Sequence, residues 1–242
     1  MKSYIIKIEL IGSEPLIWRK VIMPAGATFN RLHDIIQNVS NFKSGYPNEP
    51  YHLFEFDLGD LIVTNNEEAY IEHQHYNKNK KMYEDRLKTM PKEFFKLEIS
   101  YQERLKIEVR KPTTLKIDKY LEKNKEVKYN YDFGDGWKFI VKLEDIVEDY
   151  YFGFPTLLDG EGTAPPDDVG GLRGFYEFLK IYRDNKHPEH NVVKDWAESS
   201  YFREYDPNFI NEILKGIKYK KTEWDKIDHI NYHIIEDKYR NK

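Results

Sequence analysis

Apolar and polar residues alternate at the beginning of the chain, which predicts two β-strands. The strands are expected over residues 4–11 and 16–23, with the turn Gly12-Ser13-Glu14-Pro15 between them. Because successive side chains on a strand point to opposite faces, every second residue of the first strand faces the core. These residues are Tyr4, Ile6, Ile8 and Leu10.

Apolar residues at helical spacing predict several helices. Thr28 is a residue type that caps helix N-termini, and the stripe that follows it consists of Phe29, Leu32, Ile35, Ile36 and Val39. Similar stripes predict helices over residues 175–182 and 192–196. Asp206-Pro207 predicts the start of another helix, because proline fits the first helical position.

The clearest strand signal lies over residues 129–143, where apolar side chains fall on odd positions. Gly134-Asp135-Gly136 interrupts the run, so the pattern predicts a hairpin with one aromatic face toward the core. The residues of that face are Tyr129, Tyr131, Phe133, Trp137, Phe139, Val141 and Leu143. Other strands are expected over residues 51–57, 61–64, 96–101 and 105–110, and a short helix over 115–122.

Three segments depart from regular periodicity. Residues 65–95 are polar and lysine-rich, which indicates an excursion with some helix. Residues 153–174 hold six of the 13 glycines, so a long structured loop is expected there, and such loops are often functional. The tail suits either a strand containing Tyr232 or a helix in which Ile227, Ile230 and Ile234 share a face.

These patterns predict an α+β fold, namely a mixed or antiparallel sheet roll with helices packed on one side. One domain is expected over residues 1–218, and a C-terminal extension over 219–242.

Composition narrows the class of function. The chain has no cysteine, which excludes a disulfide scaffold, a thiolate zinc site and a cysteine nucleophile. No stretch approaches the roughly 20 apolar residues that cross a bilayer, and no signal peptide is apparent. We therefore expect a cytoplasmic protein without a membrane partner. With 38 basic and 42 acidic residues, the charge does not favour a dedicated nucleic-acid binder.

His187-Pro188-Glu189-His190 is the most ligand-like cluster, because imidazole and carboxylate groups suit zinc, manganese or iron. The two histidines are not four residues apart, as they are when a helix presents both to one metal. Pro188 instead indicates a helix start, with Glu189 in its first turn. We favour that structural interpretation and retain His187, Glu189 and His190 as candidate metal ligands.

Two pairs of aspartates are further candidates. Asp132 and Asp135 flank the tip of the hairpin, whereas Asp167 and Asp168 follow two prolines and precede Gly170-Gly171. The first pair suits Mg²⁺ or acid–base chemistry, and the second suits a cation, an amine or a basic partner. We favour the structural interpretation, in which Asp132 and Asp135 supply turn hydrogen bonds and Asp167 and Asp168 belong to a capped helix entry.

Trp18 and Arg19 lie on the second strand and complete the set of candidate binding residues. We expect Arg19 to pair with one of the loop aspartates and so to lock the loop to the sheet. His33 and His52 adjoin apolar residues, where histidines usually have structural roles. No catalytic residue is assigned, and no cofactor is expected beyond the alternative of a divalent metal.

Several short motifs stand in a characteristic order. They are Pro15-Leu16-Ile17-Trp18-Arg19, Thr28-Phe29, Leu32-His33, His52-Leu53-Phe54, Tyr131-Asp132-Phe133-Gly134-Asp135-Gly136-Trp137, Pro165-Pro166-Asp167-Asp168-Val169-Gly170-Gly171, Gly174-Phe175 and His187-Pro188-Glu189-His190. Over residues 3–215 they closely resemble the plasmid pRiA4b ORF-3-like family. The resemblance implies a compact α+β roll and an association with mobile elements. The family's resolvase-like label is not expected to hold, because Ser13 lies in a turn with only Arg19 and Arg31 nearby.

Three functional hypotheses follow. The favoured one is a non-catalytic binding or adaptor module that contacts a protein or nucleic-acid partner through residues 153–174 and 65–95. The second is a metal-dependent hydrolase or nuclease, which requires the two aspartate pairs and the His187 cluster to meet in one cleft. The third is a DNA-associated accessory factor of mobile elements, whose binding is sensitive to salt. The sequence assigns no oligomeric state.

Overall fold

A computed structural model describes residues 1–43, 52–222, 232–240 and 242. Its centre is an open sheet of eight strands in the order β5-β4-β3-β6-β7-β1-β2-β8. The strands are β1 (Ser3–Leu10), β2 (Trp18–Pro24), β3 (Phe54–Asp57), β4 (Leu61–Thr64), β5 (Glu108–Arg110), β6 (Glu126–Tyr131), β7 (Trp137–Val147) and β8 (Thr156–Glu161). Only β4 and β5 are parallel, so the sheet is mixed.

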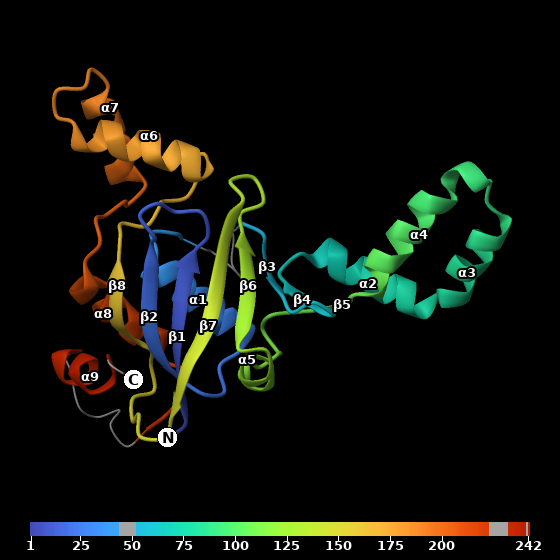
Figure 1. The fold of residues 1–242 in the computed structure, drawn as a ribbon, viewed down its shortest axis with the longest axis horizontal. Helices are drawn as coiled ribbons and strands as arrows, with labels where there is room; N and C mark the ends of the chain where they lie inside the picture. Colours follow the sequence, from blue (N-terminus) through green and yellow to red (C-terminus); the bar gives the residue numbers. More distant parts are fainter. Residues whose placement is uncertain (44–51, 223–231, 241) are drawn as a thin grey trace.

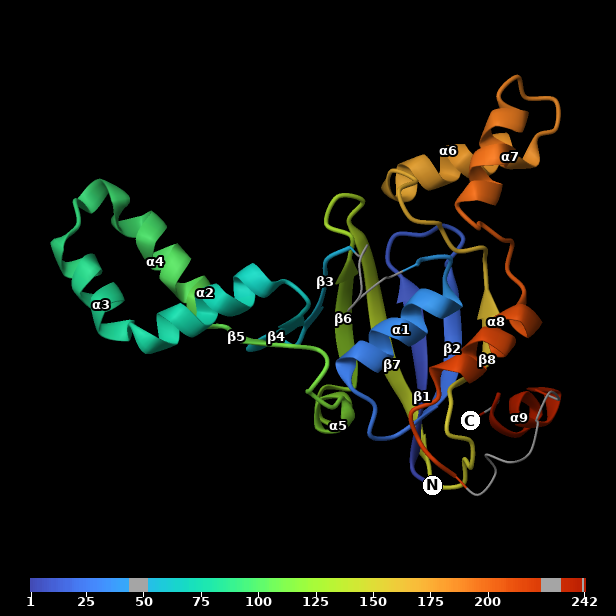
Figure 2. The same cartoon turned by 180° about the vertical axis from the view of Figure 1, so that it is seen from behind.

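Helices cover one face of this sheet, as expected for the predicted α+β class (Figure 2). α1 (Phe29–Val39) and α8 (Pro207–Leu214) lie there with the short 3₁₀ helix Lys215–Ile217. Their apolar stripes pack on the even-numbered side chains of β1 and the aromatic face of the β6–β7 hairpin. The helix caps are confirmed, because the side chains of Thr28 and Asp206 accept hydrogen bonds from backbone N–H groups one turn ahead.

α9 (Tyr232–Tyr239) covers part of the opposite face, an addition to the predicted arrangement. Its residues Ile235 and Tyr239 pack on Ile5, Ile22 and neighbouring apolar side chains. The helical alternative for the tail is therefore right over this segment, whereas Ile227 and Ile230 lie outside the described residues.

The excursion after β4 is a helical arm that projects from the edge of the sheet (Figure 1). It consists of α2 (Glu67–Lys78), α3 (Lys80–Thr89) and α4 (Lys92–Lys106). The strand predicted over residues 96–101 is wrong, because this segment lies within α4. Tyr101 and Leu105, four residues apart, face the same side and pack with Tyr76 and Tyr83 in a small core of the arm.

The segment 153–174 is not the irregular loop that was predicted. It contains β8 and the first turn of α6 (Gly171–Arg183), so only residues 153–155 and 162–170 are irregular. β8 pairs with β2, and Gly160 fits there because a Cβ atom would lie 2.9 Å from the carbonyl oxygen of Trp18. α7 (His190–Ser199) then packs on α6, and α5 (Asp118–Asn124) precedes β6.

The β6–β7 hairpin is confirmed, with Tyr131 paired opposite Trp137. One residue of its predicted apolar face differs, since Phe133 lies in the turn and is half exposed. Within the described segments, no helix is both long and apolar enough to cross a membrane.

Candidate functional site

Asp132 is held rigidly at the point where β6 ends. Its backbone N–H donates to the carbonyl of Leu53 (2.9 Å), and its Oδ1 accepts from the N–H of Gly134 (3.0 Å). The residue has a φ of +48°, a strained conformation for a side chain other than glycine. The turn therefore fixes one carboxylate oxygen and leaves Oδ2 for another partner.

Asp168 belongs to the irregular segment that enters α6. It also has a positive φ (+58°), and its side chain is 75% exposed. The segment is fastened to the hairpin tip because Oδ2 of Asp135 accepts from the N–H of Gly170 (3.1 Å). Gly171 lies so close to the tip that a Cβ atom would stand 2.8 Å from the carbonyl oxygen of Asp135.

His52 lies between these two carboxylates. Its Nδ1 is 3.5 Å from Oδ2 of Asp132, and its Nε2 is 3.9 Å from Oδ1 of Asp168. The ring stands edge-on to Tyr131, with centroids 5.7 Å apart. β3 brings His52 here because Phe54, two residues later, pairs with Tyr131.

Asp167 faces inward beneath this cluster. The Tyr131 hydroxyl donates to its Oδ1 (2.9 Å), and the N–H of Lys43 donates to its Oδ2 (2.7 Å). Burial raises the pKa of Asp167, although these two hydrogen bonds oppose the rise. Burial also raises the pKa of Tyr131, with the charge of Asp167 as the next cause. Both oxygens of Asp167 are engaged, so this residue anchors the loop.

The cluster of His52, Asp132 and Asp168 has the composition of a metal site. Each residue offers one ligand atom, and these atoms lie within 4.8 Å of one another. An ion bound at about 2.0–2.2 Å requires ligand atoms roughly 3–4 Å apart, and the exposed Asp168 side chain is free to close that difference. One imidazole and two carboxylates suit zinc, manganese or iron(II) and leave coordination positions open.

The His187 cluster does not take part in this group. Nδ1 of His187 accepts from the N–H of Glu189 (3.2 Å), and Nδ1 of His190 contacts the carbonyl of Ile181 (3.2 Å). Among the residues that the structure describes, these side chains form no metal-ligand group. Their local bonds instead order the connection between α6 and α7.

Arg19 behaves differently from the prediction. It is buried, and among the described residues it forms no ion pair with Asp167, Asp168 or another carboxylate. Its guanidinium donates to the carbonyls of Val39 (2.9 Å), Glu161 (2.8 Å) and Gly162 (2.7 Å). Arg19 therefore does lock the segment after β8 to the sheet, but through backbone carbonyls. Trp18 beside it is half-buried and lies under the ammonium of Lys7 (4.8 Å).

Sequence reasoning identified Asp132 and Asp168 as candidates but gave His52 only a structural role. The signal that could have identified His52 is that it and Asp132 each stand at the end of a strand. His52 stands just before one strand and Asp132 just after another, so antiparallel pairing of those strands places them side by side.

The fold and the cluster define an open α+β sheet protein with a candidate metal site at the end of the sheet where β6 joins β7. The chain belongs to the family of plasmid pRiA4b ORF-3-like proteins, whose model matches residues 2–212, as the motifs predicted. It is similar to the uncharacterized protein y4hQ of Sinorhizobium fredii, being 26% identical over 219 residues, or 90% of this chain and 92% of y4hQ. It is also similar to the crystal structure of MM3350, a protein of unknown function from Methanosarcina mazei Go1. That match has a TM-score of 0.54 and 26% identity, and covers 85% of this chain and 96% of the other.

Proposed function

We propose that the chain binds one divalent metal ion through His52, Asp132 and Asp168 and uses it as the Lewis acid of a hydrolytic reaction. The observation that carries this proposal is the convergence of three ligand atoms, within 4.8 Å, from segments far apart in the sequence. The two aspartates come from the hairpin and the loop that the sequence indicated, whereas His52 takes the place of the His187 cluster.

The number of protein ligands supports a catalytic metal site rather than a purely structural one. Structural zinc sites are usually closed by four protein ligands, whereas catalytic sites keep a position open for water or substrate. Here three protein ligands are available, and Asp168 and His52 both reach solvent. A divalent ion at such a site polarises an ester, amide or phosphoryl oxygen.

The proposal is tested by measuring metal binding by variants of the His52 cluster, with a variant of the His187 cluster as the control. Native mass spectrometry and calorimetric titration with Mn²⁺ and Zn²⁺ are expected to show one ion per chain. His52→Ala and Asp168→Asn are expected to weaken binding at least tenfold, whereas His187→Ala, in the separate cluster, retains it. Binding that survives His52→Ala, or that is lost on His187→Ala, contradicts the assignment.

Activity is then measured on 4-nitrophenyl phosphate and 4-nitrophenyl acetate with the ion that binds. Turnover that requires the ion and disappears in Asp168→Asn supports the hydrolase. A metal-loaded protein that cleaves neither compound opposes the hydrolytic part of the proposal.

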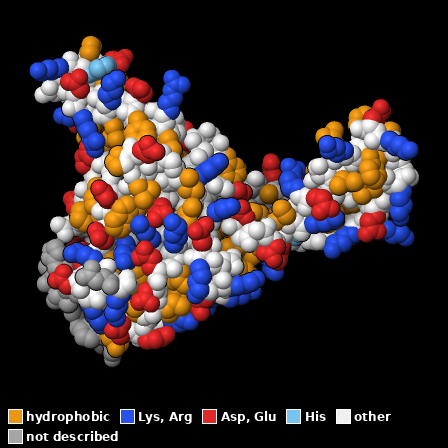
Figure 3. Space-filling view, viewed as in Figure 1, with side chains coloured by type: hydrophobic (Ala, Val, Ile, Leu, Met, Phe, Trp, Pro, Cys, Tyr) orange, Lys and Arg blue, Asp and Glu red, His pale blue; other side chains and the backbone are white. Residues whose placement is uncertain are grey.

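A second candidate, a non-catalytic binding module, is favoured by the surface of the arm. Phe94, Phe95 and Leu97 of α4 are exposed, Leu97 by 71%. Figure 3 shows apolar side chains on the arm with basic side chains around them. Residues 78–96 carry seven lysines and arginines against three acidic residues. A contiguous apolar surface of this kind marks interaction sites, so a chain that binds no metal would be better explained as an adaptor.

A further inference from the structure

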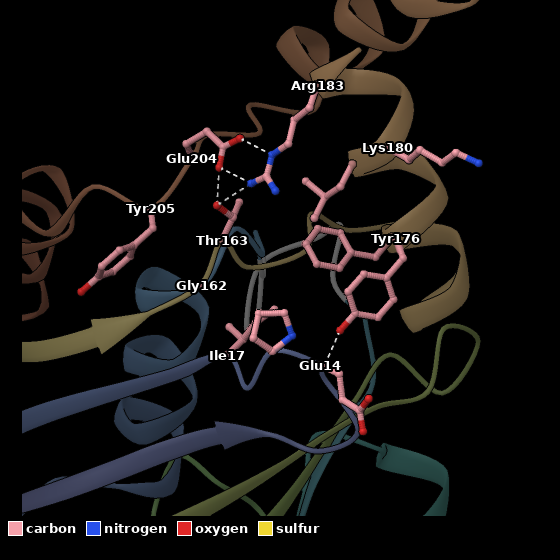
Figure 4. A pocket seen from close by; sticks show the side chains of 12 residues that line it. Glu14, Ile17, Gly162, Thr163, Tyr176, Lys180, Arg183, Glu204 and Tyr205 are labelled. Atoms are coloured by element: carbon pink, nitrogen blue, oxygen red, sulfur yellow. Dashed lines mark hydrogen bonds and ion pairs between the residues drawn. The ribbon is translucent and has the colours of Figure 1, made fainter. Parts of the chain in front are cut away.

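A pocket lies apart from the His52 cluster, between α6 and the turn that joins β1 to β2 (Figure 4). Its volume is about 560 Å³, and Gly162, Thr163 and Tyr205 complete its walls. None of the three candidate metal ligands lines it. The volume falls within the roughly 300–1,000 Å³ typical of sites for small organic molecules.

The interior of this pocket is apolar and its walls are fixed. Ile17 lies on the side of the β1–β2 turn (Figure 4). Phe175 and Leu179 line the pocket from α6. The hydroxyl of Tyr176 accepts from the N–H of Glu14 (2.6 Å), which ties α6 to the turn. Gly162 has a φ of +80°, and a Cβ atom there would stand 2.9 Å from Cγ1 of Ile17. The pocket is therefore preformed and suits an aromatic or branched aliphatic body.

A buried positive charge stands directly behind one wall. The guanidinium of Arg19 donates to the carbonyl of Gly162 (2.7 Å) and lies 4.2 Å above the ring of Tyr205. Burial lowers the pKa of Arg19 to about 10, so it stays protonated at neutral pH. Within the described part of the chain it has no carboxylate partner, and a charge in a low-dielectric interior acts over a long range.

The rim of the pocket adds a second unpaired cation. Arg183 is neutralised, because its Nη2 and Nε donate to Glu204 (2.8 and 3.1 Å). Lys180, one turn earlier on α6, is exposed and has no acidic partner among the described residues. Glu14 is the only other carboxylate among the residues that line the pocket. The charges of the lining residues therefore balance, and Arg19 behind the wall supplies the one excess positive charge around the apolar interior.

We propose that this pocket binds a small monoanionic organic acid. Its apolar body lies against Ile17, Phe175 and Leu179, and its carboxylate is attracted by Arg19 through the wall and by Lys180 at the rim. The proposal is independent of the metal site, because binding is tested without added metal.

The probes are three small molecules of similar shape that differ in charge. Phenylacetate, benzyl alcohol and benzylamine are titrated separately, and binding is followed by ligand-observed NMR and by calorimetry. Phenylacetate is expected to bind saturably and at least tenfold more tightly than benzylamine, with benzyl alcohol between them. Equal binding of the acid and the amine overturns the charge argument, and an absence of saturable binding by all three overturns the site.

Variants locate the binding. Leu179→Trp fills the pocket and is expected to abolish phenylacetate binding, with circular dichroism as the check on folding. Lys180→Glu changes only an exposed side chain and is expected to weaken phenylacetate at least fivefold and to favour benzylamine. Lys186→Glu, an exposed lysine outside the pocket, is the matched control and retains wild-type affinity. Equal effects of the two lysine variants, or unchanged binding by a folded Leu179→Trp protein, refute the assignment.

Discussion

The buried His33 makes the stability of this protein depend on pH. The residue lies on α1 with no exposed surface, and its ring stacks on Phe54 with centroids 3.8 Å apart. Its Nδ1 and the hydroxyl of Tyr129 share a hydrogen bond of 2.7 Å. Gln37 Nε2 donates to the same hydroxyl (3.1 Å), so the environment is polar but uncharged. Burial lowers the pKa of His33 to about 3.

The sign and size of the effect follow from linkage. The unfolded chain takes up a proton at His33 near pH 6.5, whereas the folded chain does so only near pH 3. Stability is therefore fully present above pH 6.5 and falls as the pH decreases toward 3. Within that window the free energy of unfolding falls by about 1.4 kcal/mol for each pH unit. Because the window begins only at pH 6.5, the change from pH 7 to pH 5 lowers the free energy of unfolding by about 2 kcal/mol. The raised pKa of Asp167 acts in the opposite direction, over a pH window that begins at its ordinary value of 3.8 and extends upward from there.

The assay is urea denaturation of the wild type and of His33→Phe at pH 7, 6 and 5. Phenylalanine keeps an aromatic ring on Phe54 but cannot take up a proton, so the variant is expected to lose about 2 kcal/mol less between pH 7 and 5. His187→Gln, on the connection between α6 and α7, is the control and retains the wild-type slope. A His33→Phe protein with the wild-type slope would refute the assignment of the pH dependence to His33.

Two further predictions concern packing. Arg19→Met leaves the carbonyls of Val39, Glu161 and Gly162 without their donor, and urea denaturation at pH 7 is expected to show a loss of about 3–5 kcal/mol. A loss below about 1 kcal/mol would contradict the role given to Arg19. A chain that ends at residue 222 lacks Ile235 and Tyr239, whose burial contributes roughly 1.5–3 kcal/mol each. Its urea midpoint is expected to fall while metal binding at the other end of the sheet is retained, and an unchanged midpoint would show that α9 does not stabilise the sheet.

Elements that rest on local signals were predictable from the sequence. α1 and α8 combine a strong apolar stripe with a capping residue, and β1, β6 and β7 combine strict alternation with glycine-rich or proline-containing turns. Part of α4 was wrongly predicted to be a strand, because the apolar residues of this helix are mostly exposed and do not pack on a large core. β8 was hidden for the opposite reason, since glycines that normally interrupt strands are required here by the close approach of β2.

The candidate site could be predicted only in part. Asp132 and Asp168 stand in turn-rich motifs, where carboxylates are conspicuous. Their meeting with His52 depends on the pairing of β3 with β6 and on the contact of Gly171 with the hairpin tip. Both contacts join residues that are far apart in the sequence, so the pattern of apolar residues within a short stretch does not indicate them. The same limit applies to Arg19, whose carbonyl partners Val39 and Glu161–Gly162 lie in two segments far from it in the sequence.

The arm occupies the one place in the sheet where two neighbouring strands run parallel. Parallel neighbours require a connection that returns to the same end, and here α2, α3 and α4 form that return. Because the connection leaves and rejoins the sheet at its edge, its length is free to vary while the order of the other strands stays the same. The tip between α3 and α4 is therefore a natural graft point, where a fluorescent or affinity module is carried well away from the β6–β7 hairpin and from α6 (Figure 1).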